Sequence, residues 1–233
     1  MTPISQPSAP PVRLAVFASG GGTNFQALLD AFHASPDSRI RIVLLLASAA
    51  SIGAVERAER AGVPVEVIAH ADSEGILKAL RTAHVDWIVL AGYLRLVPPA
   101  VLEDFPGRVL NIHPALLPSF GGRGMYGRRV HEAVLDSGVR ISGATVHRVD
   151  REYDSGAIVA QWPVAVRDDD TPEALAARVL QVEHRLLPAV VERLTTGEGS
   201  ADPKPHFTPS DAPPELSEIG AGASSASTGA TRR

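Results

Sequence analysis

Short apolar runs of strand length recur along the first half of the chain, separated by stretches in which apolar residues fall three or four positions apart. Such runs are typical of buried strands, and the wider spacing is typical of helices. This alternation indicates a mostly parallel, twisted α/β sheet with helices on both faces and a Rossmann-type N-terminal half. The predicted strands are 12–18, 39–48, 63–69, 87–91 and 108–113, and the predicted helices are 25–32, 53–62, 73–82 and a segment from Pro98 to the stop at 105–107.

The second half of the chain predicts a different arrangement. A helix is expected over 128–136, followed by strands over 141–149 and 157–166. The short link between these strands favours an antiparallel pair at the far edge of the sheet. A long helix then begins at Thr171 and Pro172, and Pro188 is expected to kink it. Its apolar stripe leaves out Glu183 and His184, and consists of Leu175, Val179, Val182, Leu186 and Val190.

Composition divides the 233 residues into one domain with two polar ends. Residues 1–11 are rich in proline and carry no charged side chain, and residues 197–233 are dominated by Gly, Ser, Pro, Ala and Thr. Segments with so few bulky apolar residues cannot bury enough surface to order themselves. We therefore expect a disordered extension over 1–11, a folded domain over 12–196 and a disordered tail over 197–233.

Charge and residue usage exclude several classes of function. The net charge is −4, so no overall basic field attracts nucleic acid. The chain has no cysteine, which excludes disulfides, cysteine-containing metal sites and thiol catalysis. No apolar run reaches the ~18 residues of a membrane helix, and the N-terminus lacks the pattern of a signal peptide. A cytoplasmic protein that uses no metal, stays away from membranes and is a monomer or homodimer is expected.

The stretch Val109–Pro114 combines a strand with polar chemistry. Asn111 and His113 fall on one face because side chains alternate along a strand, and Pro114 must end the strand because it has no N–H. Ligands bind at the carboxyl ends of strands in open α/β sheets. An amide donor beside an imidazole suits stabilisation of an oxyanion formed from a carbonyl. A structural strand-end histidine and a turn-forming asparagine are the alternative.

A glycine-rich loop follows the first strand. Residues 20–24 read Gly-Gly-Gly-Thr-Asn and precede a helix, so backbone N–H groups and the helix dipole are available to a phosphate. The loop matches neither the nucleoside triphosphate motif nor the dinucleotide fingerprint, because Phe25 replaces the third glycine of the latter. Thr23 and Asn24 can cap the helix in either case. A tight turn without a ligand remains the alternative.

Three further loops lie beside this predicted site. Residues 92–97 follow the fourth strand and are either a slot for a flat aromatic ligand or core. The glycine-rich segment 119–127 has the composition of a mobile lid. The turn 150–156 holds three carboxylates, of which Asp154 is best placed to orient a histidine, although a solvated turn is the usual role of such runs.

Together these motifs make the family recognisable. Asn-Ile-His-Pro-Ala-Leu-Leu-Pro from Asn111, Ile-Ser-Gly-Ala-Thr-Val-His from Ile141 and Tyr-Asp-Ser-Gly from Tyr153 resemble, in this order, the folate-dependent formyltransferases. The resemblance covers about residues 12–196. It implies a mostly parallel α/β sheet and transfer of a formyl group from 10-formyltetrahydrofolate, the co-substrate, to the amine of phosphoribosylglycinamide in purine biosynthesis, without a metal.

The resemblance also implies roles for individual residues. The catalytic group is Asn111, His113 and Asp154. The ribonucleotide phosphate is bound by Gly22, Thr23 and Asn24, and the folate by Leu94, Arg95, Leu96, Val97 and Asn111. His147 and Glu183 match motif positions near the site.

Two departures from the family pattern leave contacts unassigned. The loop 119–127 differs from the proline- or histidine-bearing loop of many members, and the arginine that many members place upstream of the fourth strand is missing from 71–76. Three alternatives stay open at this stage. They are methionyl-tRNA formyltransferase, which has an RNA-binding C-terminal domain, formyltetrahydrofolate deformylase, which has an additional N-terminal domain, and a non-catalytic phosphoribosyl-binding module.

Overall fold

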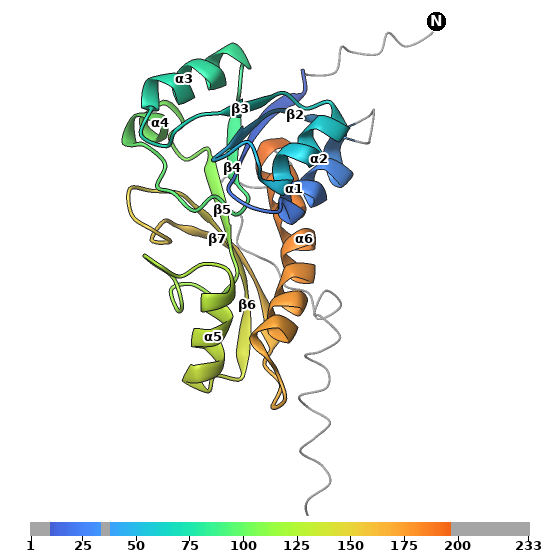
Figure 1. The fold of residues 1–233 in the computed structure, drawn as a ribbon, viewed down its shortest axis with the longest axis vertical. Helices are drawn as coiled ribbons and strands as arrows, with labels where there is room; N and C mark the ends of the chain where they lie inside the picture. Colours follow the sequence, from blue (N-terminus) through green and yellow to red (C-terminus); the bar gives the residue numbers. More distant parts are fainter. Residues whose placement is uncertain (1–9, 34–37, 197–233) are drawn as a thin grey trace, which may run out of the picture.

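Strand β1 (Val12–Ala18) is the centre of the fold, and its apolar residues from Leu14 to Ala18 are completely buried. We describe residues 10–33 and 38–196 of a computed structural model, drawn in Figure 1. The predictions for 1–9 and 197–233 therefore lie outside the described residues. The other strands are β2 (Ile40–Ala47), β3 (Val65–Val67), β4 (Trp87–Leu90), β5 (Val109–His113), β6 (Ile141–Arg148) and β7 (Ile158–Ala165). The helices are α1 (Thr23–Leu28), a π-helical turn (Leu29–His33), α2 (Gly53–Ala61), α3 (Ser73–Thr82), α4 (Pro99–Asp104), α5 (Arg128–Ser137) and α6 (Pro172–Thr196).

The described strands form one sheet in the order β3-β2-β1-β4-β5-β6-β7. All pairs from β3 to β5 are parallel, whereas β6 is antiparallel to both β5 and β7. This confirms the predicted parallel sheet with an antiparallel pair at the far edge. The order reverses between β1 and β4, and in such sheets this switch point opens the crevice that binds ligands.

Two apolar cores cover the two faces of the sheet. Side chains of α1, α2 and α6 pack on one face, and those of α3 and α4 pack on the other (Figure 1). Each fully buried Leu, Val or Phe contributes about 1.5–3 kcal/mol, so the alternating apolar faces of the strands stabilise both layers. The core thus holds β1, β4 and β5 rigidly, with their carboxyl ends at one edge of the sheet.

Some local predictions need correction. Strand β3 spans only Val65–Val67 instead of 63–69, because it is a half-exposed edge strand. The predicted cap of α1 by Thr23 or Asn24 is wrong, since Gly22 occupies the N-cap position in a left-handed conformation without a side-chain bond. Helix α6 runs as one helix through Pro188 to Thr196, and the kink expected at Pro188 stays a prediction.

Candidate active site

Asn111 and His147 come together because β5 and β6 are antiparallel. The two residues lie directly opposite in the ladder, and Asn111 Nδ2 is 3.0 Å from His147 Nε2. His147 Nδ1 lies 2.8 Å from the Arg148 carbonyl oxygen, which can only accept a hydrogen bond. Neutral His147 therefore carries its hydrogen on Nδ1 and accepts through Nε2. This fixes the amide nitrogen of Asn111 toward His147.

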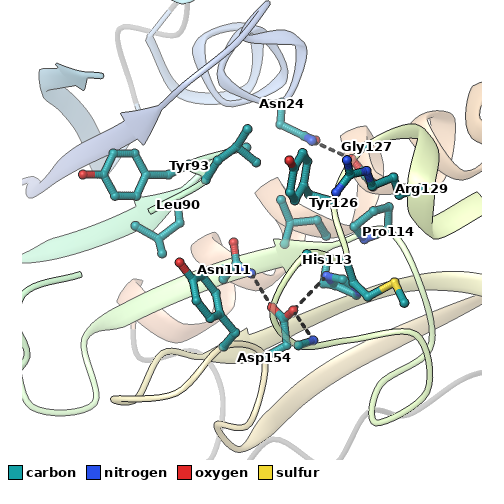
Figure 2. A pocket seen from close by; sticks show the side chains of 18 of the residues that line it. Asn24, Leu90, Tyr93, Asn111, His113, Pro114, Tyr126, Gly127, Arg129 and Asp154 are labelled. Atoms are coloured by element: carbon teal, nitrogen blue, oxygen red, sulfur yellow. Dashed lines mark hydrogen bonds and ion pairs between the residues drawn. The ribbon is translucent and has the colours of Figure 1, made fainter. Parts of the chain in front are cut away.

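Asp154 joins this pair from the turn that links β6 to β7. Its Oδ1 lies 3.4 Å from Asn111 Nδ2, and its Oδ2 lies 3.5 Å from His113 Nδ1 and 2.9 Å from the Gly122 N–H (Figure 2). Asp154 has a φ of 55°, a left-handed conformation that aspartate tolerates better than most residues. The sequence-predicted group of Asn111, His113 and Asp154 is therefore brought together.

A glycine sets how closely the Asp154 turn approaches the sheet. A Cβ atom at Gly156 would overlap the carbonyl oxygen of Arg148 on β6. Only glycine permits this contact, which carries Asp154 over the end of β5. In the Asp-Ser-Gly sequence, Gly156 is thus required by backbone packing, and Asp154 supplies the carboxylate of the site.

His113 is 3% exposed and has an acceptor at each ring nitrogen. Its Nε2 lies 2.8 Å from the Phe120 carbonyl oxygen, and its Nδ1 faces Asp154. Burial lowers the pKa of His113 below its usual value of 6.5, although Asp154 and Phe120 oppose this effect. His113 is therefore mainly neutral at pH 7, with its hydrogen on Nε2.

The carboxylate of Asp154 remains charged. Burial by itself raises the pKa of Asp154, but the neighbouring His147 and His113 and the Gly122 N–H together lower it below its usual value. A charged carboxylate beside two histidines can orient them and stabilise a proton on either ring.

Asn24 and Glu183 form a second polar pair, whose burial the sequence pattern does not predict. Glu183 was expected off the apolar stripe of α6, yet it is buried at 6% exposure and accepts a 2.6 Å hydrogen bond from Asn24 Nδ2. Burial raises the pKa of Glu183 from 4.5 to about 7, partly opposed by Asn24. A carboxyl group with this pKa can exchange a proton near neutrality.

Only part of the glycine-rich loop lines the cleft. Asn24 lines the cleft, whereas Gly22 is buried against Ala54 of α2 and Thr23 faces a separate hollow. Exposed Gly20 and Gly21 have no heavy atom within 4 Å of the position that a Cβ would take. Open space of this kind lets a ligand approach the loop backbone.

The pair of Asn111 and His147 and the pair of Asn24 and Glu183 line one cleft of ≈ 970 Å³ at the switch point. Its opposite wall is the segment after β4, where Leu94 and Leu96 are 45% and 41% exposed while Val97 is buried. Leu94, Arg95 and Leu96 are therefore accessible from the cleft, whereas Val97 is buried against the core.

Several residues of the cleft were not predicted from the sequence. Tyr126 and Arg129 come from the glycine-rich loop and the start of α5, with the Arg129 guanidinium 5.5 Å from the Tyr126 ring centre (Figure 2). His131 also lines the cleft. The four glycines of this loop predicted a lid but not the positions of these side chains, because the direction of each side chain depends on the path of the loop.

Within residues 10–33 and 38–196, no group of three or more His, Cys, Asp or Glu is arranged to hold a metal ion. In the same residues, no helix has both the length and the apolar character to cross a membrane.

Comparison with known proteins shows the family to which a chain with this sheet and this cleft belongs. The formyl transferase family matches residues 12–191, and the chain belongs to this family. It is 47% identical over 189 residues to phosphoribosylglycinamide formyltransferase, chloroplastic, of Arabidopsis thaliana, covering 77% of this chain and 64% of that protein. The corresponding protein of Vigna unguiculata is 43% identical, with 78% and 60% covered. The chain thus spans less than two thirds of the length of these plant relatives.

Solved structures agree on the fold. The phosphoribosylglycinamide formyltransferase of Anaplasma phagocytophilum has a TM-score of 0.76 at 33% identity, covering 86% of this chain and 95% of that one. The described sheet, including its antiparallel far side, is therefore the formyltransferase fold.

Proposed function

We propose that this protein transfers the formyl group of 10-formyltetrahydrofolate to the amine of phosphoribosylglycinamide, a step of purine biosynthesis. The observation that carries the proposal is the convergence of Asn111, His113 and Asp154 at the end of β5. Two relatives support the choice of substrates, because the similar proteins of Arabidopsis thaliana and Vigna unguiculata are both named phosphoribosylglycinamide formyltransferase.

The acceptor nucleotide is proposed to bind on the side of α1 and α6. The backbone of the glycine loop, with Gly22, Thr23 and Asn24, would hold the phosphate, supported by the open space at Gly20 and Gly21. Glu183 beside Asn24 offers a buried carboxyl group to polar atoms of the acceptor.

The folate is proposed to bind along the opposite wall. Exposed Leu94 and Leu96 offer apolar surface to a flat ring system, and Arg95 offers a cation to an acidic tail. Val97 supports this wall from the core, and Asn111 lies at its inner end. The formyl group would then lie between the two substrates, next to His113.

The chemistry follows from these positions. The amine nitrogen attacks the formyl carbon, and the electron pair of the carbonyl moves to oxygen, which becomes an oxyanion. Asn111 Nδ2–H and His113 Nε2–H are proposed to donate to this oxyanion. The amine proton passes through water to Asp154. The oxyanion then collapses to a carbonyl and breaks the bond from carbon to folate N10, and the proton held by Asp154 returns through water to N10. The products are N-formylated phosphoribosylglycinamide and tetrahydrofolate.

The geometry around His113 refines its proposed role. Burial lowers the pKa of His113, and the Phe120 carbonyl oxygen accepts a hydrogen bond from its Nε2. A neutral His113 can still donate to the oxyanion once the loop carbonyl of Phe120 moves away. The long 3.4 Å contact between Asn111 and Asp154 is likewise weak enough to be exchanged for one to the substrate.

The test is tetrahydrofolate release by the purified protein with both substrates present. Release that requires phosphoribosylglycinamide supports the proposal. Equal release without it would assign a hydrolase, and release only with methionyl-tRNA would assign a tRNA formyltransferase. Ribonucleotide binding without any turnover would leave a non-catalytic module.

A further inference from the structure

His131 is a buried cleft residue to which neither the motifs nor the proposed chemistry gives a role. It lies on α5, is 4% exposed and contributes to the cleft wall. Its Nδ1 is buried, and no hydrogen-bond partner for it exists among the described residues. Most buried polar side-chain atoms are hydrogen-bonded, so this exception calls for an explanation.

The surroundings of the ring select its tautomer. A buried N–H without an acceptor is more costly than a buried acceptor without a donor, so Nδ1 stays without hydrogen. Burial and the neighbouring His113 also lower the pKa of His131, which disfavours the doubly protonated ring. The single ring hydrogen of His131 is then carried by Nε2.

The hydrogen on Nε2 faces the cleft. In the part of the chain that the structure describes, His131 Nδ1 is buried and has no hydrogen-bond partner, whereas Nε2 is not among the buried atoms that lack a partner. No described group bonds Nε2 either, so this atom is exposed to the cleft that the residue lines. His131 thus offers a neutral N–H donor on a rigid helix.

The position of His131 indicates which substrate it meets. Helix α5 packs against α6, and Leu180 and Glu183 of α6 line the same cleft. Leu94 and Leu96 of the proposed folate wall come instead from the loop after β4. His131 therefore belongs to the side proposed for the acceptor nucleotide, close enough to His113 for the two rings to interact electrostatically.

We propose that His131 Nε2–H donates a hydrogen bond to an oxygen of the glycinamide part of the acceptor and so orients its amine beside His113. The inference rests on the proposed function, which supplies the acceptor. It makes His131 a substrate-binding residue that a search for charged clusters would overlook, because its contribution is a fixed neutral donor.

Three replacements separate this role from packing. The amide nitrogen of Gln reaches the position of His Nε2, that of Asn reaches the position of Nδ1, and Phe keeps the ring without a donor. We expect His131→Phe and His131→Asn to lower kcat/KM for phosphoribosylglycinamide about 10-fold, the loss of one hydrogen bond. His131→Gln should stay within about 3-fold of wild type, and KM for the formyl folate should be unchanged in all three. Equal losses in all three variants, or losses shared by the folate, would show a packing role and overturn the inference.

A measurement on the unaltered protein keeps the inference testable if the variants fold poorly. Nitrogen-15 NMR of the histidine rings at pH 7.5 distinguishes the two neutral tautomers, and we expect His131 as the Nε2–H form. An Nδ1–H form would overturn the inference. Absence of turnover in the wild-type protein would refute the proposed function and this role together, whereas normal wild-type turnover with an unaffected His131→Phe would refute the role of His131 alone.

Discussion

Replacement of Glu183 by glutamine tests the electrostatics of the cleft most directly. Glutamine keeps the length and shape of the side chain, and its carbonyl oxygen can accept the hydrogen bond that Asn24 Nδ2 makes at 2.6 Å. The change therefore removes the titration of the buried carboxyl group while leaving packing almost intact. Any difference between the two proteins that depends on pH reports on Glu183.

The sign and size of the effect follow from its pKa, which burial raises from 4.5 to about 7. Between these values the folded protein holds a proton that the unfolded chain has lost, so stability falls as pH rises. The fall is about 1.4 kcal/mol per pH unit and about 3 kcal/mol in total. Above pH 7 both states are ionised and the difference is constant. The wild-type protein should therefore equal Glu183→Gln below pH 4.5 and be the less stable of the two above pH 7.

Urea unfolding at pH 5, 6, 7 and 8, followed by the fluorescence of Trp87 and Trp162, measures this difference. The stability advantage of Glu183→Gln should grow from pH 5 to pH 7 and then level off. The same variant should bind phosphoribosylglycinamide more weakly, because it cannot present a negative charge to the acceptor. A stability difference that stays constant from pH 5 to pH 8 would refute the raised pKa and the reasoning from burial.

Three other predictions concern the catalytic group and the glycine loop. His113→Ala should lower kcat about 100-fold with little change in either KM. The double variant His113→Ala with Asp154→Asn should have a kcat no lower than that of the worse single variant, and additive losses would disprove the pairing of the two residues. Asp154→Asn should further lower the pKa of His113, measured by NMR titration, because Asp154 raises it; an unchanged titration would contradict this. Gly22→Val should lower Tm, since its Cβ would lie 2.8 Å from Ala54, whereas Gly21→Val should fold normally and raise KM for the ribonucleotide alone; a normal KM would remove the loop from the site.

Local patterns in the sequence predicted most of the fold and the centre of the site. Strand and helix periods are set by neighbouring residues, so the alternation of elements and the shared face of Asn111 and His113 could be read directly. The contact between Asn111 and His147 could not, because it depends on the register of two antiparallel strands. The approach of Asp154 likewise depends on the tight packing of Gly156 against β6.

Helix α6 shows why burial was harder to predict than periodicity. One apolar stripe accounts for contact with one neighbour, but α6 packs against α1, α5 and the sheet. Leu187 and Val191 are buried beside Glu183 on the part of the helix that the stripe left out. Glu183 therefore fell outside the predicted apolar stripe, although Leu187 and Val191, one and two turns further along, extend the buried face to it.

The features that the sequence did not reveal are locally unfavourable, and they gather around the same cleft. Glu183 is a buried carboxyl group with an amide as its partner, and His131 leaves a buried nitrogen unsatisfied. Phe120 and Asp154, which face the two ring nitrogens of His113, both have left-handed backbone conformations. Each feature lowers stability by about 1–3 kcal/mol, and apolar or glycine replacements would relieve it. Their concentration at one end of the sheet argues that this chain retains them for the chemistry of the cleft, since stability alone would favour their loss.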